Sequence, residues 1–205
     1  MVGEVLIVGA VRGLVSEGKR VAVIVESTTP DIIGLSISRE GLLAMEKLGG
    51  GDREQCKPAN PEEEIYMRGL SAYGEVMKPP PCFLAAIGLQ IPVEAIDMDD
   101  ELYTAAYCRY VSTIDMIRQG GRQKRLRRLA INSKSPREFV IKWDRVVNRL
   151  GGYRRLEMAR EAWLAKGAAR LASKYQRPLI VIEYERLAGT VRYMDRMDCQ
   201  YRIIG

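Results

Sequence analysis

Apolar residues along this chain fall into short continuous runs that are separated by longer amphipathic stretches. Residues 4–10 and 178–183 are almost wholly β-branched or apolar, as in strands that are buried on both faces of a sheet. Residues 30–35 and 91–97 have the same character and contain a proline at or near their start. These runs predict strands of a parallel sheet.

The stretches between the runs predict helices. Residues 15–28 contain Val21-Ala22-Val23-Ile24-Val25, which suits a strand, but a parallel sheet needs a crossover helix here, so we predict a helix. Asn60-Pro61 and Ser135-Pro136 are typical helix starts, each with a capping side chain before proline. Further helices are expected over residues 82–90, 100–119 and 153–175, with Gly120-Gly121 as an interruption and Gly151-Gly152 as a stop. Four residues of the 153–175 helix are expected to face inward: Leu156, Ala159, Trp163 and Leu171.

Strands that alternate with helices predict an α/β fold, a mainly parallel β-sheet flanked by helices, with a helical insertion. The length of 205 residues suits one domain, 1–205. Within it, a basic helical segment at about 118–155 is inserted before the last helix–strand unit.

Composition excludes several classes of site. The chain has no histidine, which removes Ser-His-Asp and Cys-His catalysis and every zinc site that uses imidazole. The cysteines at 56, 82, 108 and 199 form no C-x-x-C pair, so we expect buried free thiols, with one disulfide as the alternative. No cofactor and no metal ion are expected. We find no secretory signal and no membrane span, and we expect a cytoplasmic protein whose arginine-rich composition fits a thermophile.

The formal net charge of +6 is unevenly distributed. Residues 118–155 contain 13 basic and 2 acidic residues. Lys124, Arg125, Arg127 and Arg128 form the densest part, which makes a nucleic-acid interface one interpretation. The other is a solvated helix face, partly paired with the acidic residues at 97–101, because aromatic residues that stack on bases are not interleaved with these charges.

Several motifs occur in the same order as in a known family. The first strand ends in Gly9-Ala10-Val11-Arg12, and Pro30 to Ser38 follows as P-D-I-I-G-L-S-I-S. Ile96-Asp97-Met98-Asp99 ends a later strand, and Arg160-Glu161-Ala162-Trp163-Leu164-Ala165 lies in the long helix. Val181 to Gly189 closes the series as V-I-E-Y-E-R-L-A-G. Over residues 5–190 this arrangement resembles the TraB/PrgY family, which is related to the erythromycin-esterase and Tiki hydrolases.

The chain departs from the family pattern at the positions of the residues that would carry the family's chemistry. The resemblance implies histidines at two positions where this chain has Arg12 and Arg186. It implies acidic residues where Ser36 and Ser38 stand, and glycine where Glu183 stands. Because a guanidinium group stays protonated, it serves neither as a metal ligand nor as a neutral base. We therefore expect a degenerate hydrolase-type site rather than the metal-dependent hydrolase that the resemblance implies.

In an open parallel sheet, ligands bind at the carboxyl ends of the strands. The sequence predicts that seven residues gather at that edge and bind a small anionic ligand or a peptide carboxylate: Arg12, Ser36, Ser38, Asp97, Arg160, Glu183 and Arg186. A peptide is suggested by the resemblance alone.

Two alternatives remain open for this edge. In the first, the arginines form structural salt bridges with Asp97, Asp99, Glu183 or Glu185 and fill an inactive site. In the second, Asp97, Asp99, Asp100 and Glu183 hold a hard cation such as Mg²⁺ in a carboxylate-only hydrolase. Against the second, Asp99-Asp100-Glu101 is explained by the start of the next helix.

Overall fold

The computed structural model describes residues 4–48, 61–126, 128–129 and 131–205. Within them, the chain forms a five-stranded sheet in which every pair of neighbouring strands is parallel, in the order β3-β2-β4-β1-β5. The strands are β1 (Val5–Ala10), β2 (Ile32–Leu35), β3 (Val93–Ala95), β4 (Pro178–Glu183) and β5 (Tyr201–Ile203). The predicted α/β class is confirmed.

The two central strands explain the apolar runs. Every residue of β1 and of β4 is buried, because helices cover both faces of the sheet at this point. The strands pair in register from Leu6 with Leu179 to Ala10 with Glu183. The ends of the two longest hydrophobic runs therefore lie side by side.

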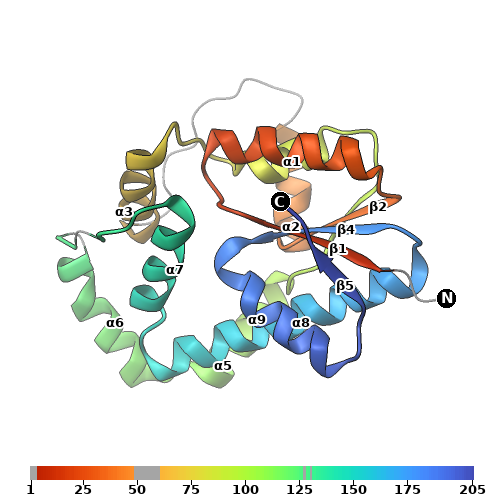
Figure 1. Cartoon of the computed structure of the whole chain (residues 1–205). Coiled ribbons are helices and arrows are strands. Elements are labelled where there is room, and N and C mark those ends of the chain that lie inside the picture. The colour runs from red at the N-terminus through yellow and green to blue at the C-terminus, as the bar shows by residue number, and fades with distance from the viewer. Residues whose placement is uncertain (1–3, 49–60, 127, 130) are drawn as a thin grey trace.

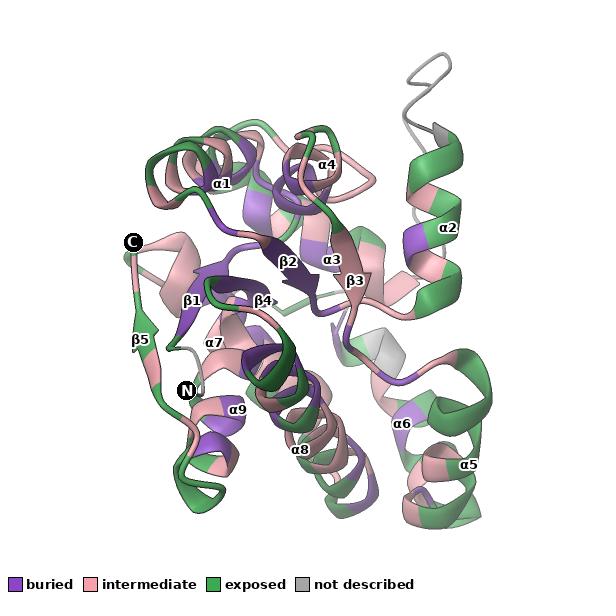
Figure 2. Cartoon of the chain, turned by 90° about the vertical axis from the view of Figure 1, so that its right-hand side faces the viewer, coloured by how far each residue is buried: buried purple, intermediate pink, exposed green. Residues whose placement is uncertain are grey.

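One face of the sheet is covered by α1 (Val15–Thr28), α2 (Arg39–Leu48) and α4 (Pro81–Ile87), whose apolar residues form a cluster with those of β1, β2 and β4. On the opposite face, α8 (Gly151–Lys174) and α9 (Tyr184–Arg196) pack against the same strands, and α5 (Asp100–Tyr110) packs against α8. Figure 2 shows the sheet between these helix layers.

A third hydrophobic cluster lies beyond the carboxyl ends of the strands. It is built by α3 (Pro61–Leu70), α6 (Thr113–Leu126) and α7 (Pro136–Val147), with Phe139 and Trp143 stacked at its centre. In Figure 1 these helices stand beside the sheet at its left edge, facing the point where β1 ends. This helical group forms the second wall of the space above the strand ends.

The crossover helix predicted over residues 15–28 is confirmed in spite of its β-branched composition. In α1, Val21 and Val25 are buried against the sheet while Val23 is 63% exposed. Residues four positions apart therefore share one face, as in a helix, and the residue between them lies on the other. Gly18 allows α1 to approach α4 closely, because a Cβ at this position would lie 2.9 Å from the carbonyl oxygen of Pro81. Tertiary packing therefore overrides the local preference for a strand.

Several element boundaries differ from the predictions. The helix predicted over residues 100–119 is two helices, α5 and α6, which separate where Ser112 caps α6 by accepting from the Asp115 N–H at 3.1 Å. Gly120 and Gly121 lie inside α6 and do not interrupt it. Gly151-Gly152 lies after the end of α7, as predicted, but these two glycines are also the first residues of α8. The sequence did not predict α2, α9 or the edge strand β5.

The buried face of α8 also differs in part from the prediction. Leu156 and Leu171 are buried as expected, whereas Ala159 and Trp163 are only half-buried. The contact with the sheet is made instead by small or apolar neighbours on the adjoining face: Leu164, Ala165 and Ala168. Gly167 permits this, because a Cβ there would lie 2.8 Å from the Ile96 side chain.

Cys82 is a buried free thiol, as expected, and Cys199 is partly buried, but the free thiol of Cys108 is exposed. Cys56 and the predicted cap Asn60 lie outside the described residues. In the described part of the chain, no helix is both long and apolar enough to cross a bilayer.

Candidate functional site

The carboxyl ends of four strands bring the predicted residues to one edge of the sheet. Arg12 follows β1, Ser36 follows β2, Asp97 follows β3, and Glu183 is the last residue of β4. Arg160 reaches this edge from the middle of α8, and Arg186 from the first turn of α9.

Arg12 has the most exposed side chain of the three arginines, with 44% of it exposed. Its Nη1 lies 3.2 Å from Glu183 Oε1, and its Nε lies 4.0 Å from Glu185 Oε1. The guanidinium carbon lies 5.3 Å from the centre of the Tyr66 ring, at cation–π distance. Arg12 is thus held from one side by carboxylates and an aromatic ring while part of it stays open.

Arg160 joins two strand ends through α8. Its Nε donates to Asp97 Oδ2 at 3.2 Å, and its Nη2 pairs with the same carboxylate. The guanidinium group also lies 3.1 Å from Glu157 and 3.4 Å from Glu183. With its side chain 19% exposed, Arg160 is largely occupied by these partners.

Arg186 is almost completely buried, with 5% of its side chain exposed. It pairs with Asp144 of α7 and lies 3.1 Å from Glu157 and 3.3 Å from Glu161 of α8. Burial lowers the pKa of this guanidinium to about 10, still far above neutrality, so the group remains charged. Arg186 therefore ties together α7, α8 and α9.

The two serines make local hydrogen bonds. Ser36 is buried, and its Oγ accepts from the Glu183 N–H at 3.1 Å, which links the ends of β2 and β4. Ser38 Oγ accepts from the Gly41 N–H at 3.1 Å, at the start of α2. Both side chains were expected to face a bound anion, but neither of them lies among the described residues that line the cavity at this edge.

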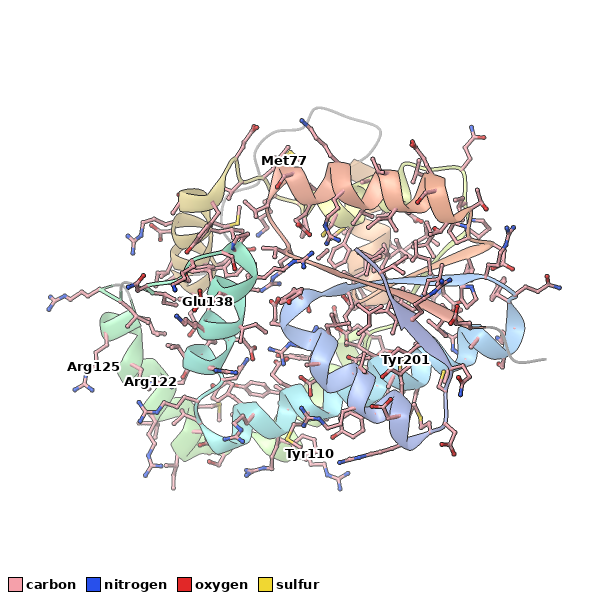
Figure 3. All side chains as sticks on the ribbon, viewed as in Figure 1. Met77, Tyr110, Arg122, Arg125, Glu138 and Tyr201 are labelled. Carbon is pink, nitrogen blue, oxygen red and sulfur yellow. The ribbon has the colours of Figure 1, made fainter. Side chains whose placement is uncertain are left out.

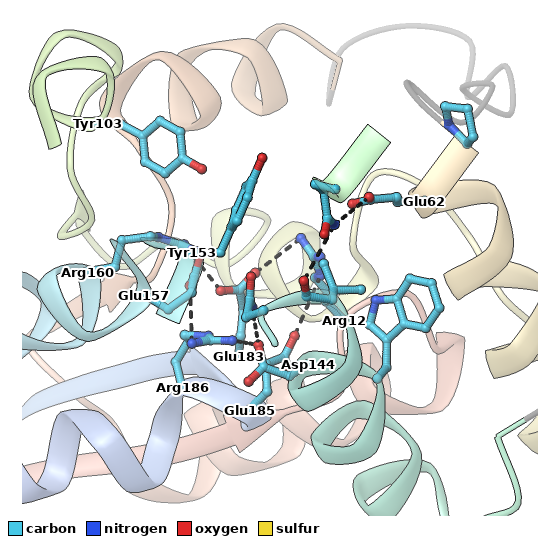
Figure 4. Close-up of a pocket in the computed structure, with 15 residues that line it drawn as sticks. Arg12, Glu62, Tyr103, Asp144, Tyr153, Glu157, Arg160, Glu183, Glu185 and Arg186 are labelled. Carbon is cyan, nitrogen blue, oxygen red and sulfur yellow. Dashed lines mark hydrogen bonds and ion pairs between the residues drawn. The ribbon is translucent and has the colours of Figure 1, made fainter. Parts of the chain in front are cut away.

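This cavity has a volume of about 470 Å³ and lies between the strand ends and the helical group of α3, α6 and α7. Figure 4 shows the three arginines together with Asp144, Glu157, Glu183 and Glu185, while Tyr103 and Glu62 lie above them in this view. The lining residues are Arg12, Pro61, Glu62, Tyr103, Gln119, Trp143, Asp144, Val147, Asn148, Tyr153, Glu157, Arg160, Glu183, Glu185 and Arg186. Of the seven predicted residues, Arg12, Arg160, Glu183 and Arg186 line the cavity, and Asp97 contacts it through Arg160.

Carboxyl groups outnumber the arginines in this site. Burial, and then the neighbouring Glu183, raises the pKa of Glu185 to about 7. Burial, and then Glu157, raises the pKa of Glu161 to about 7 as well. The pKa of Glu157 is raised by the same burial. Near neutral pH the site therefore contains carboxyl groups that are only partly ionised.

Sequence reasoning missed Glu157, Asp144 and Tyr153. Glu157, Arg160 and Glu161 are spaced three and four residues apart, which places them on one helix face, and this signal was present in the sequence. Asp144 gives no such signal, because it comes from a separate helix, and only the packing of α7 brings it to Arg186.

The carboxylates of the proposed Mg²⁺ site have other partners. Asp97 pairs with Arg160, and Asp99 caps α5 by accepting from the Leu102 N–H at 2.8 Å. Asp100 is exposed at the start of α5. No group of three acidic or cysteine side chains suited to a metal ion occurs among the residues that the structure describes.

The exposed arginines at the densest part of the basic segment do not line this cavity, although other residues of the segment do. Arg125 and Arg128 are exposed at and after the end of α6, and in Figure 3 the side chain of Arg125 extends away from the body of the molecule. Arg122 instead turns back and donates to the backbone carbonyl of Val146 at 2.7 Å. Arg127 and the side chain of Lys124 lie outside the described part of the chain.

No protein-family model matches this chain, and no curated protein matches it. The resemblance to the TraB/PrgY family therefore stays a prediction from the sequence motifs.

Proposed function

We propose that this protein binds a small ligand through an anionic group of that ligand, in the cavity above the strand ends, with Arg12 as the anchoring residue. In this proposal the chain has a TraB/PrgY-like architecture whose hydrolase-type site has changed into a binding site. The observation that carries the proposal is the partly exposed side chain of Arg12, which lines the cavity at the edge of a parallel sheet where ligands bind.

The exposure and the ion pairs of the three arginines favour Arg12 as the residue that contacts the ligand. Arg186 is 5% exposed and Arg160 is 19% exposed, and each is paired with three carboxylates. An incoming anion would have to break those pairs, whereas Arg12 keeps an accessible side. The fork of a guanidinium group suits carboxylate or phosphate oxygens.

Binding without catalysis fits the chemistry of the site better than hydrolysis. The chain has no histidine, and the guanidinium groups of Arg12 and Arg186 neither ligate a metal ion nor accept a proton. The raised pKa values of Glu161 and Glu185 are also explained by the buried ion-pair network, since such networks shift pKa values without any catalytic role.

A thermal-shift panel tests the proposal. The purified protein is heated with succinate, inorganic phosphate, 4-aminobutyrate or trialanine. A ligand at 100 times its dissociation constant adds about 2.7 kcal/mol to the free energy of unfolding, which raises the melting temperature by about 5–10 °C in a domain of this size. We expect such a shift with at least one of these compounds, and we expect Arg12→Gln to abolish it.

Arg202→Gln is the matched control, because Arg202 lies on the edge strand β5, is 63% exposed and pairs with Glu4 at 3.2 Å, away from the cavity. This variant should keep the full shift. If no compound shifts the melting temperature, or if Arg12→Gln keeps the shift, the proposed function is wrong.

A further inference from the structure

The charges that line the cavity are unbalanced. Three guanidinium groups face five carboxyl groups among the described lining residues, which leaves two negative charges in excess when all are ionised. Asp97 and Glu161, which pair with Arg160 and Arg186 just behind the lining, add to this excess. Because a buried excess of one charge is costly, a ligand that brings a positive charge would relieve it, and a ligand with two negative charges would increase it.

Glu185 shows where that positive charge is missing. Its side chain is 93% buried, since 7% is exposed, and it lines the cavity. Its Oε2 is buried and has no hydrogen-bond partner among the described residues. Its other oxygen, Oε1, lies 4.0 Å from Arg12 Nε, which is beyond hydrogen-bond distance. A buried acceptor without a donor costs free energy that a donor on the ligand would recover.

Resting on the binding function proposed above, we infer that the ligand is a zwitterion, whose carboxylate contacts Arg12 and whose ammonium group donates to Glu185. The two side chains lie 4.0 Å apart, so the oppositely charged ends of one small molecule reach both. Because the negative charge is shared by both oxygens of the carboxylate, an ammonium group that donates to the oxygen facing the cavity compensates the charge of the whole group. Amino acids and short peptides are the class of ligand that meets this description.

The protonation of Glu185 gives this inference an independent signature. Burial raises its pKa to about 7, so at pH 7 the carboxyl group is partly protonated. An ammonium group beside it favours the ionised form, and binding therefore releases part of a proton. The titratable and charged groups that act on Glu185 come from four elements or their ends: Arg12, Tyr66, Arg160 and Glu183.

Isothermal titration at pH 7 with three compounds of equal carbon number tests the inference. Succinate carries two carboxylates, 4-aminobutyrate carries one carboxylate and one ammonium group, and putrescine carries two ammonium groups. We expect 4-aminobutyrate to bind at least tenfold more tightly than either of the others. Titration in two buffers of different ionisation enthalpy should show proton release on binding of 4-aminobutyrate.

Glu185→Gln should raise the dissociation constant of 4-aminobutyrate about tenfold or more, remove the proton release and leave the affinity for succinate equal or higher. Glu101→Gln is the matched control, because Glu101 is exposed on α5 and is not among the lining residues; it should change neither affinity nor proton release. If Glu185→Gln fails to fold, the order of the three affinities in the unaltered protein still decides the question.

The outcomes separate this inference from the proposed function. If succinate binds as tightly as 4-aminobutyrate and both need Arg12, the ligand is a plain anion and the zwitterion inference is wrong, while the proposed function stands. If putrescine binds most tightly and does not need Arg12, both are wrong. If none of the three compounds binds, the zwitterion inference is wrong, and the thermal shifts with phosphate and trialanine decide whether the proposed function stands.

Discussion

Arg12 follows the end of β1 and Glu183 is the last residue of the neighbouring β4, and their side chains form an ion pair with Nη1 and Oε1 3.2 Å apart. The contact follows from the register, because Ala10 of β1 pairs with Glu183 of β4 and the chain then turns towards the cavity. It holds Arg12 by one side only, since 44% of this side chain remains exposed. The pair therefore positions Arg12 without occupying all of it.

Arg186 and Arg12 should differ sharply in their effect on stability. Arg186→Met leaves the carboxylates of Asp144, Glu157 and Glu161 without their shared cation in a buried site, so the free energy of unfolding should fall by about 3–5 kcal/mol. Arg12→Gln removes a half-exposed cation and should cost no more than about 1 kcal/mol. Urea denaturation at pH 7 measures both, and an equal or reversed order would contradict the structural role of Arg186.

Stability should fall as the pH rises from 5 to 8. The pKa values of Glu161 and Glu185 are raised from the ordinary 4.5 to about 7, so between these pH values the folded protein holds protons that the unfolded chain has released. The free energy of unfolding therefore decreases with increasing pH across this window. Glu185→Gln should make the decrease shallower, because glutamine does not titrate. Melting temperatures at pH 5, 6, 7 and 8 test this, and an unchanged slope in the variant would contradict the raised pKa of Glu185.

Two glycine substitutions should act in opposite directions. Gly18→Ala places a Cβ 2.9 Å from the backbone oxygen of Pro81 and should destabilise the packing of α1 against α4. Gly120→Ala lies in α6, where a Cβ meets nothing within 4 Å, and should stabilise the protein by about 0.5–1 kcal/mol. Thermal denaturation of both variants checks the prediction. Stabilisation by Gly18→Ala would show that the two helices can move apart without cost.

Asp99→Ala should act on stability alone. Asp99 caps α5 through its hydrogen bond with the Leu102 N–H, and loss of such a cap costs about 1 kcal/mol. Ligand binding should be unchanged, because Asp99 does not line the cavity. A loss of binding in this variant, measured by titration, would instead support a role for the acidic residues at 97–100 in the site.

The exposed arginines of the basic segment should not take part in binding the small ligand. The double variant Arg125→Gln, Arg128→Gln changes two exposed side chains at and after the end of α6, outside the cavity lining. The thermal shift produced by the ligand should be the same as in the unaltered protein. A separate titration with single-stranded DNA at two salt concentrations tests the nucleic-acid interpretation, in which the double variant would weaken binding and reduce its salt dependence.

More of the fold than of the candidate site could be predicted from the sequence. Continuous apolar runs identify β1 and β4, and the rule that parallel strands need a crossover predicts α1 against its own composition. The short edge strand β5 carries no such run, because its residues are half-buried or exposed, and it was missed. The break between α5 and α6 depends on the reciprocal hydrogen bonds of Ser112 and Asp115. In the sequence, this pair of polar residues looks the same as one on the exposed face of a continuous helix.

For the site, strand ends alone placed Arg12, Asp97 and Glu183 correctly at one edge. They did not reveal that Arg186 would be buried or that Ser36 would bond to the backbone of β4, because both depend on the close packing of neighbouring elements. The excess of carboxyl groups could not be predicted either, since Glu62 comes from α3 and Asp144 from α7, and only the packing of these helices brings them to the strand ends.

A crystal structure of the protein with bound 4-aminobutyrate is the most informative single measurement. We predict that the carboxylate of the ligand lies within hydrogen-bond distance of the Arg12 guanidinium group and that its ammonium group lies at Glu185. A ligand bound elsewhere on the molecule, or a cavity that contains only solvent at saturating 4-aminobutyrate, would contradict this prediction.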